Sequence, residues 1–231
     1  MTVHFAPHLA DIENQTAQSR APRVSVKSAD NVYRTKIKRV FDFTASLCVL
    51  VVLSPLIIVM AAIIGLDGHN PFYSQMRVGK NGKTFRIWKL RTMVHNADDL
   101  LEAHLAENVD ARIEWDTTQK LKQDPRITFV GRVLRKTSVD ELPQLLNVVL
   151  GSMSLVGPRP MMVSQKSNYD GEAYYRLRPG ITGLWQVSDR NESKFTDRVR
   201  YDEIYDQTVS FVVDFTILMR TVVVVIRGTG Y

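Results

Sequence analysis

Two adjacent carboxylates, Asp140 and Glu141, are the residues around which the chemistry of this sequence is organised. They lie in the stretch 135–160, RKTSVDELPQLLNVVLGSMSLVGPRP, which also carries cations near both of its ends. A carboxylate can act as a nucleophile or bind a hard cation such as Mg²⁺. Proline is tolerated in the first turn of a helix, so Pro143 predicts a helix that begins near Asp140. The exposed amides of such a helix start favour an ionised aspartate and attract phosphate.

A structural role for the same residues is the main alternative. Ser138 and Glu141 have the spacing of a capping box, in which each side chain binds a free backbone amide of the other residue. Acidic residues are also common in the first turn of a helix for structural reasons alone. Taken by itself, the Asp140–Glu141 pair fits a helix cap better than a catalytic pair, so the rest of the chain has to decide.

Composition narrows the class of partner. The chain has 231 residues, enough for one or two domains with a buried core. Its formal net charge of +6 indicates an anionic partner, which could be nucleic acid, anionic lipid or a phosphorylated substrate. No motif that reads nucleic acid is present, so we expect no nucleic-acid partner. Cys48 is the only cysteine, which excludes an intrachain disulfide and fits a reducing cytoplasm.

The apolar run 40–66 is the strongest indication of membrane association. It carries no charge from residue 43 to residue 66, which is long enough for a membrane helix. A buried core helix is the weaker alternative at this length. Ser54 and Pro55 interrupt the run near its middle, and proline removes one backbone hydrogen bond there, so we expect a kink.

Basic residues flank this run on both sides, between residues 34 and 39 and again between residues 77 and 91. Positive residues mark the cytoplasmic side of a membrane segment, so a spanning helix would leave one basic flank outside. A helix that enters, bends and returns satisfies both flanks. We therefore expect a disordered tail over 1–31, a re-entrant membrane helix over 32–67 and a cytoplasmic catalytic domain over 68–231.

Residues 71–91 predict a β-hairpin, because the Asn-Gly pair at 81–82 tolerates the positive φ angles of a tight turn. Lys89 and Arg91 project from the end of its second arm, and on pattern alone they are solvated charges. Residues 95–122 are rich in Asp, Glu, Ala and Leu and predict helix.

Two further segments complete the predicted fold. Three glycine or proline residues within 178–187 indicate a loop, with Trp185 as a packing anchor. The apolar segment 209–226 contains Asp214 and Arg220, which favours an interfacial helix over a spanning one, with a buried core helix as the alternative. Together the elements predict an α+β, mainly helical membrane protein with a re-entrant helix, a small β-hairpin and interfacial amphipathic helices.

Four ordered motifs resemble those of the bacterial sugar transferases, the monotopic phosphoglycosyl transferases that prime exopolysaccharide or glycan assembly. The resemblance runs from about residue 35 to the C-terminus and is closest to the short galactose or glucose phosphotransferases of exopolysaccharide synthesis. The motifs are KLRTM at 89–93, SVDELPQLLNVVLG at 138–151, MSLVGPRP at 153–160 and RPGITGLWQV at 178–187.

The resemblance implies transfer of a hexose 1-phosphate from a UDP-sugar to undecaprenyl phosphate, with Mg²⁺, at the cytoplasmic face of the bacterial inner membrane. The reaction would pass through an aspartyl-phosphosugar intermediate and release UMP. The catalytic pair falls on Asp140 and Glu141, with Asp140 also a ligand to the metal. The helix break falls on Ser54 and Pro55. Inner-membrane lipids are further partners, and a homodimer stays open.

Phosphate-binding cations of the family correspond to Lys89, Arg91, Arg135, Arg159 and Arg190 in this chain. One departure concerns Asp189, which stands where the family often has glycine and places a carboxylate beside Arg190. A catalytically silent, membrane-anchored scaffold with the same fold is the alternative function.

Overall fold

The computed structural model describes residues 32–118, 121–188 and 195–226 of the chain. The tail over 1–31 and the pair Asp189–Arg190 lie outside these residues, so the predictions for them stand as they were made. The mainly helical α+β fold is confirmed, with a small sheet and a long apolar helix near the N-terminus.

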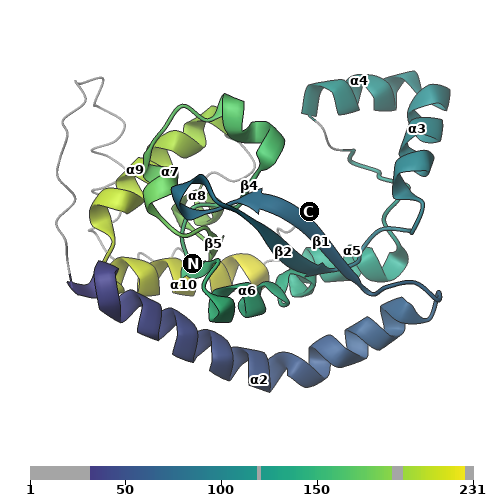
Figure 1. The fold of residues 1–231 in the computed structure, drawn as a ribbon. Coiled ribbons are helices and arrows are strands. Elements are labelled where there is room, and N and C mark those ends of the chain that lie inside the picture. The colour runs from purple at the N-terminus through teal and green to yellow at the C-terminus, as the bar shows by residue number, and fades with distance from the viewer. Residues whose placement is uncertain (1–31, 119–120, 189–194, 227–231) are drawn as a thin grey trace, which may run out of the picture.

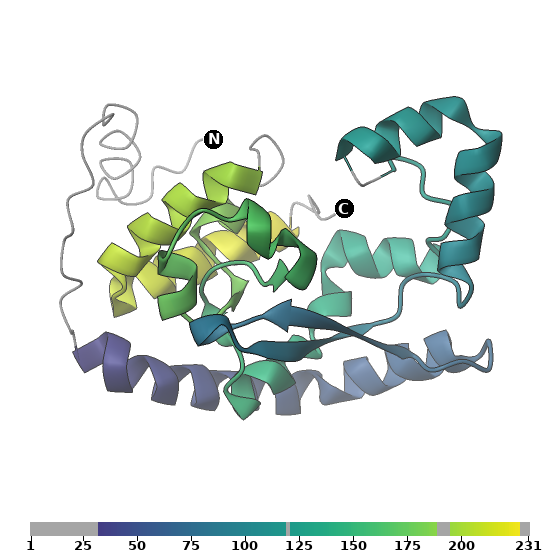
Figure 2. The same cartoon turned by 45° about the horizontal axis from the view of Figure 1, so that its top comes forward.

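The long helix α2 (Lys38–Gly65) follows a short π-helical turn, Tyr33–Ile37. The other α-helices are α3 (Ala97–Glu107), α4 (Val109–Thr118), α5 (Phe129–Thr137), α6 (Gln144–Leu150), α7 (Ala173–Arg176), α8 (Leu184–Val187), α9 (Arg198–Thr208) and α10 (Phe211–Ile226). The strands are β1 (Phe72–Val78), β2 (Thr84–Leu90), β3 (Ser154–Val156), β4 (Met161–Met162) and β5 (Gly180–Thr182). Figures 1 and 2 show α2 along one side of the molecule, while α3 and α4 project at the far end from α9.

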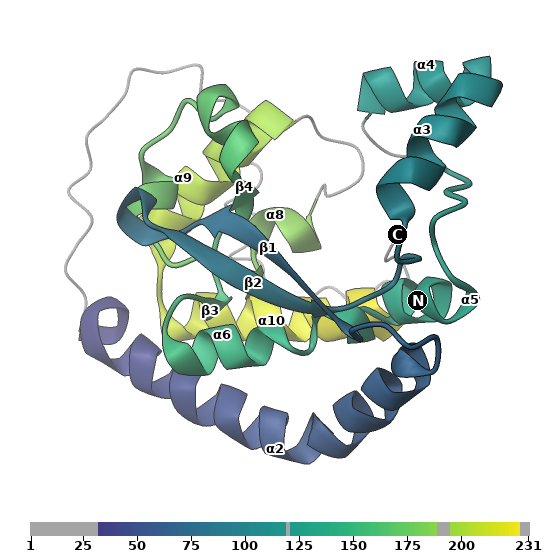
Figure 3. The same ribbon diagram turned by 45° about the vertical axis from the view of Figure 1, so that its right-hand side comes forward.

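Helix α2 is the one helix of the described residues that is long and apolar enough to cross a membrane. Most of its apolar side chains are exposed, as expected for a surface that contacts lipid and not a protein core. Figure 3 shows α2 bent near its middle, with both of its ends rising toward the rest of the molecule. This shape agrees with the re-entrant form, whose placement in a bilayer stays a prediction.

The Ser54–Pro55 pair explains how α2 tolerates a proline in its interior. Pro55 has no N–H to donate to the carbonyl of Val51, one turn earlier. The hydroxyl of Ser54 donates to that carbonyl oxygen over 2.8 Å and replaces the missing hydrogen bond. The Val51 carbonyl therefore keeps a hydrogen-bond donor although the helix bends, which matters in an apolar environment.

The first turns of α2 are tied to the C-terminal helix by a buried polar cluster. The carboxylate of Asp214 on α10 accepts from the hydroxyls of Tyr33 and Tyr205 over 2.7 and 2.6 Å. It also accepts from Lys38 Nζ over 2.6 Å. Asp42 on α2 accepts in turn from residues of β3. Because each buried carboxylate has several donors, this cluster fixes the orientation of α2 on the domain.

The predicted β-hairpin is confirmed. Strands β1 and β2 pair antiparallel around a turn in which Asn81 and Gly82 have φ values of 57° and 73°. Strand β4 adds to β1, and β3 pairs with β5 in a separate parallel pair. The side chain of Asn147 on α6 makes two hydrogen bonds to the β2 backbone, accepting from the amide of Trp88 and donating to the carbonyl of Arg86. The hairpin and α6 are thus held in one register.

The helix predicted over 95–122 is present as α3 and α4, with a break at Asn108. The side chain of Asn108 accepts from the amide of Ala111 over 3.0 Å and so caps the start of α4.

The loop predicted over 178–187 is wrong, because β5 and α8 occupy most of it. Its glycines serve close packing and not a flexible turn. A Cβ atom on Gly180 would lie 2.1 Å from the amide nitrogen of Gly157, and one on Gly183 would lie 2.1 Å from the Gly157 carbonyl oxygen. Trp185 packs under the guanidinium of Arg198, whose carbon lies 5.2 Å from the ring centre.

Helix α10 combines the two alternatives considered for the C-terminal segment. Val213 and Ile217 are buried in the core around Tyr205 and Val156. The opposite face exposes a row of apolar side chains, which are Phe211, Val212, Phe215, Met219, Val222, Val223 and Ile226. One face of α10 therefore belongs to the core, and the other is free for an apolar surface such as a membrane.

The bend of α2 leads to a topology prediction. In a Cys48→Ser background, single cysteines introduced at Lys36 and Lys80 should be labelled from the same side of intact or inverted membrane vesicles. Both positions are exposed in the structure, so accessibility within the protein does not limit labelling. Replacing Pro55 by Leu should straighten α2 and favour a spanning form. Labelling of the two cysteines from opposite sides would exclude the re-entrant helix.

Candidate active site

Asp140 lies in a short 3₁₀ turn, Val139–Glu141, between α5 and α6. The turn forms because Ser138 adopts a left-handed conformation, with φ 57° and ψ 17°, which ends α5 and reverses the chain. The helix predicted to begin at Asp140 is corrected here: α6 begins at Gln144, with Pro143 as its N-cap. Pro143 thus stands at a helix start, as expected, but Asp140 lies in the preceding turn.

The capping box between Ser138 and Glu141 does not form, since Ser138 makes no side-chain cap hydrogen bond. The Glu141 carboxylate instead accepts from Lys89 Nζ on strand β2 over 2.7 Å. The same ammonium lies 3.8 Å from the Asp140 carboxylate. The hairpin therefore brings a predicted cation, Lys89, to both predicted carboxylates.

The environment of Asp140 perturbs its ionisation. The residue is only 6% exposed. Burial raises the pKa of the Asp140 carboxyl above its ordinary value, the Lys89 charge lowers it, and the neighbouring Glu141 raises it further. A buried carboxyl with a raised pKa beside a specific cation is typical of an active site, although ion-pair networks also shift pKa values.

Arg135 approaches the pair from the last turn of α5. Its Nε donates to the hydroxyl of Thr92 over 2.9 Å, which holds the side chain beside the 3₁₀ turn. Burial lowers the pKa of Arg135, and the nearby Asp140 opposes that change. The charge of Arg135 in turn lowers the pKa of Asp140. The structure thus brings Arg135 and Lys89 into the electrostatic environment of one carboxylate.

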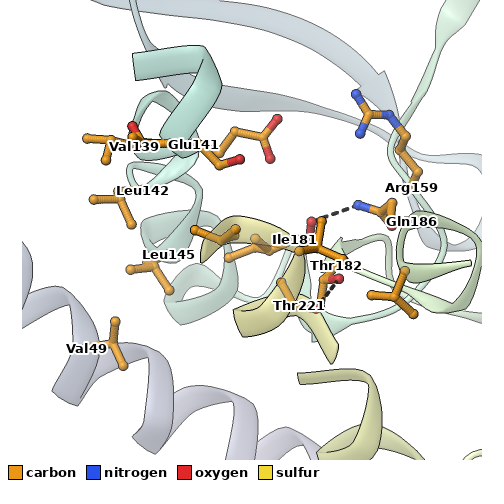
Figure 4. Close-up of a pocket in the computed structure, with 15 residues that line it drawn as sticks. Val49, Val139, Glu141, Leu142, Leu145, Arg159, Ile181, Thr182, Gln186 and Thr221 are labelled. Carbon is orange, nitrogen blue, oxygen red and sulfur yellow. Dashed lines mark hydrogen bonds between the residues drawn. The ribbon is translucent and has the colours of Figure 1, made fainter. Parts of the chain in front are cut away.

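A cavity of about 230 Å³ is lined by Glu141, the neighbour of Asp140 in the 3₁₀ turn. Figure 4 shows Glu141 and Arg159 on two sides of the upper part of the view, and Val49 of α2 at its lower left. Further polar lining comes from Thr137, Ser138, Thr182, Gln186 and Thr221. The apolar lining consists of Val49, Val139, Leu142, Leu145, Ile181, Val187, Val224 and Val225. The site therefore joins charged groups to an apolar chamber.

Two arginines that the sequence analysis did not select as site residues bind the backbone at Arg159 and Pro160. Arg198 donates to the carbonyl oxygen of Arg159, and Arg77 donates to that of Pro160 over 3.4 Å. Burial lowers the pKa of Arg77 and of Arg198, and the charge of Arg159 adds to both effects. The one sequence signal that could have drawn attention to Arg198 is its spacing of four residues from Asp202, which places opposite charges on one face of α9.

Arg91 pairs with a carboxylate other than Asp140 and Glu141. Two of its guanidinium nitrogens donate to the Asp67 carboxylate over 2.7 and 2.6 Å. The remaining contacts go to the carbonyls of Asn70 and Ile64. Arg91 thus holds the end of α2 against the hairpin, and its predicted phosphate contact would require this arrangement to open. Arg190 lies outside the described residues.

The metal predicted from the resemblance would rely on few protein ligands. Among the described residues, no group of three or more His, Cys, Asp or Glu side chains is arranged to hold a metal ion. Asp140 and Glu141 offer adjacent carboxylates, and Mg²⁺ is commonly bound by one or two carboxylates together with substrate phosphates. The donor set therefore fits Mg²⁺ that arrives with a phosphorylated substrate.

One family of known proteins matches nearly all of the described part of the chain. Residues 33–228 match the family described as bacterial sugar transferase. The exopolysaccharide production protein ExoY of Sinorhizobium fredii is 46% identical over 196 residues, which cover 84% of this chain and 87% of that protein.

Two longer relatives are similar over the same length. The undecaprenyl-phosphate galactose phosphotransferase of Salmonella typhimurium is 45% identical and the UDP-galactose-lipid carrier transferase of Erwinia amylovora is 44% identical, each over 196 residues. The match covers 84% of this chain but only 41% of each of those proteins.

The buried charge of Asp140 leads to a stability prediction. Its folded-state pKa is raised, so its contribution to stability is complete below the unfolded pKa, near 4, and is lost as pH rises through the folded pKa. At neutral pH the folded protein carries the unfavourable free energy of a buried, ionised Asp140. Asp140→Asn removes it and should stabilise the fold by on the order of 1 kcal/mol, or about 2–4 °C in Tm.

The gain in Tm should shrink as the pH is lowered toward 4, because the wild-type carboxyl then becomes protonated as well. Thermal unfolding of both proteins across this pH range measures the difference. A variant that is less stable than wild type at neutral pH would show that the Asp140 carboxylate stabilises the fold, as a helix cap or in an ion pair.

Proposed function

The chain belongs to the bacterial sugar transferase family, and on this ground we propose that it transfers a hexose 1-phosphate from a UDP-sugar to undecaprenyl phosphate. The sugar would be galactose or glucose, and the product would prime exopolysaccharide synthesis. The observation that carries the proposal is the buried Asp140, held beside Lys89 and next in the sequence to Glu141, which lines a chamber shared with the apolar helix α2.

The first step forms a bond between an Asp140 carboxylate oxygen and the β-phosphorus of the donor. The bond from that phosphorus to the bridging oxygen breaks, and UMP leaves with the bridging oxygen and its electron pair. In the second step an oxygen of the lipid phosphate attacks the same phosphorus and displaces the Asp140 carboxylate. Both steps are phosphoryl transfers, in which the protein contributes mainly positioning and charge neutralisation.

The cations around Asp140 have separate tasks in this scheme. Lys89 holds Glu141 and keeps a positive charge 3.8 Å from the nucleophile. This charge opposes the rise in pKa that burial causes, so it favours the ionised form of Asp140 that can attack phosphorus. Arg135 and Arg159 would bind phosphate oxygens through their guanidinium groups. Mg²⁺, when bound with the donor, would neutralise phosphate charge, with Asp140 and Glu141 as the available protein ligands.

The apolar surfaces of α2 and α10 support a location at the cytoplasmic face of the inner membrane. The acceptor is a lipid whose phosphate lies at the membrane surface, so the nucleophile has to lie close to that surface. Because α2 and α10 both contribute to the chamber beside Glu141, a membrane contact through their exposed faces would place the carboxylates at the interface.

The function is tested by incubating purified enzyme with radiolabelled UDP-galactose or UDP-glucose, with and without undecaprenyl phosphate. We expect one of the sugars to appear in the lipid fraction together with one UMP per transfer. UMP should also be released once per enzyme without the acceptor, since the two steps are separate. A strict requirement for both substrates before any UMP forms would exclude the covalent route. Complete inactivity with both sugars would favour the catalytically silent scaffold.

Arg159 gives a second test, because lysine keeps the charge but cannot reproduce the two-pronged contact. Arg159→Lys should lower kcat/KM by roughly 30- to 150-fold, which corresponds to about 2–3 kcal/mol. The matched control is Arg132→Lys on the exposed face of α5, which should behave as wild type. Equal activity of the two variants would assign Arg159 a purely structural role.

A further inference from the structure

The chamber beside the carboxylates differs in chemistry from one end to the other. The charged lining consists of Arg159 and of Glu141, which directly follows Asp140 in the sequence (Figure 4). The apolar lining includes Leu142, which follows the turn, Leu145 on α6 and Val224 on α10. Such an arrangement suits a ligand with an anionic head and a hydrocarbon tail, and it does not suit a nucleotide or a free sugar.

The apolar end of the chamber is continuous with the exposed surface of two helices. Val49 on α2 and Val225 on α10 both line the chamber, yet they are 42% and 38% exposed. Their neighbours on α2 and α10 carry the exposed apolar side chains described above. A hydrocarbon chain that enters from the lipid-facing surface would therefore meet the apolar side chains of Val49 and Val225 at the chamber.

We propose that this chamber binds the first isoprene units of the lipid acceptor, the units directly attached to its phosphate. This inference rests on the proposed function, which makes the acceptor a polyprenyl phosphate. An apolar cavity of about 150 Å³ can hold the six carbons of benzene. The chamber of about 230 Å³ thus has room for roughly two five-carbon units, and the remainder of the chain would extend along α2 into the membrane.

Helix α10 forms one wall of the chamber. Its position at the chamber is fixed by a hydrogen bond of 2.7 Å between the hydroxyls of Thr221 on α10 and Thr182 on β5. Three residues of α10 line the chamber, so the width available to a branched chain depends on where this helix packs. The C-terminal helix then has two roles: its exposed face contacts lipid, and its buried side selects the acceptor chain.

The test uses phosphates of one, two and three isoprene units, namely dimethylallyl, geranyl and farnesyl phosphate. Wild-type kcat/KM should rise tenfold or more from the first acceptor to the second, because burial of each additional CH₂ is favourable. The value should rise little from the second acceptor to the third, because the third isoprene unit would lie outside the chamber. UMP release without an acceptor reports the first step separately.

Val224→Trp fills the chamber, whereas Val223→Trp changes an exposed neighbour on the same helix that does not line it. We expect Val224→Trp to lower kcat/KM for geranyl phosphate about tenfold and to abolish the gain from one to two units. Its acceptor-free UMP release should stay normal, which also shows that the variant folds. Val223→Trp should retain the wild-type profile.

A second matched pair decides the case if Val224→Trp does not fold. In Val49→Phe the new ring would enter the chamber from α2, whereas Val51, two residues away, is exposed and does not line the chamber. We expect Val49→Phe to lose the gain from one to two units and Val51→Phe to keep it. A wild-type profile in both chamber-filling variants would overturn the assignment. Normal UMP release with no dependence on chain length in the wild type would overturn it as well. A wild type that releases no UMP from either donor would instead reject the proposed function.

Discussion

The contact of Lys89 with Glu141 and Asp140 is the interaction on which the site depends, because it joins the hairpin to the turn that carries the carboxylates. Burial of Asp140 favours its neutral form, and a neutral carboxyl is a poor nucleophile. Lys89 offsets this effect without neutralising the site completely, since its ammonium lies nearer to Glu141 than to Asp140. The arrangement leaves Asp140 buried and incompletely paired, so the site is expected to trade stability for reactivity.

A second constraint is that the charged site has to open toward lipid. Helices α2 and α10 are far apart in the sequence, yet both contribute to the chamber next to Glu141. The buried Asp214 cluster fixes them relative to each other, because Tyr33 and Lys38 from the N-terminal side donate to a carboxylate of α10. The serine hydroxyl at the proline allows α2 to bend while its backbone remains hydrogen-bonded. The apolar surface and the catalytic turn thus form one rigid arrangement.

Local patterns in the sequence predicted much of this structure, including the hairpin at its Asn-Gly turn and the helical character of the chain. They could not predict the 3₁₀ turn at Asp140, because the left-handed Ser138 that creates it leaves no compositional signal. The glycines of 178–187 predict a loop on local pattern alone. Their close packing against the Gly157 backbone could not be predicted, because Gly157 is distant in the sequence. The phosphate-binding role of Arg91 comes from the family resemblance and stays a prediction; its contact with Asp67, which lies 24 residues earlier, could not be read from local sequence.

The most direct test of the central claim is to identify the atom that carries the transferred group. Wild-type enzyme is incubated with the UDP-sugar donor alone, quenched in acid, digested and analysed by peptide mass spectrometry. We predict that the peptide containing Asp140 gains one hexose phosphate, that the modification maps to Asp140, and that adding undecaprenyl phosphate before the quench removes it. An unmodified peptide under conditions of complete turnover, or a phosphosugar on a different residue, would contradict the account.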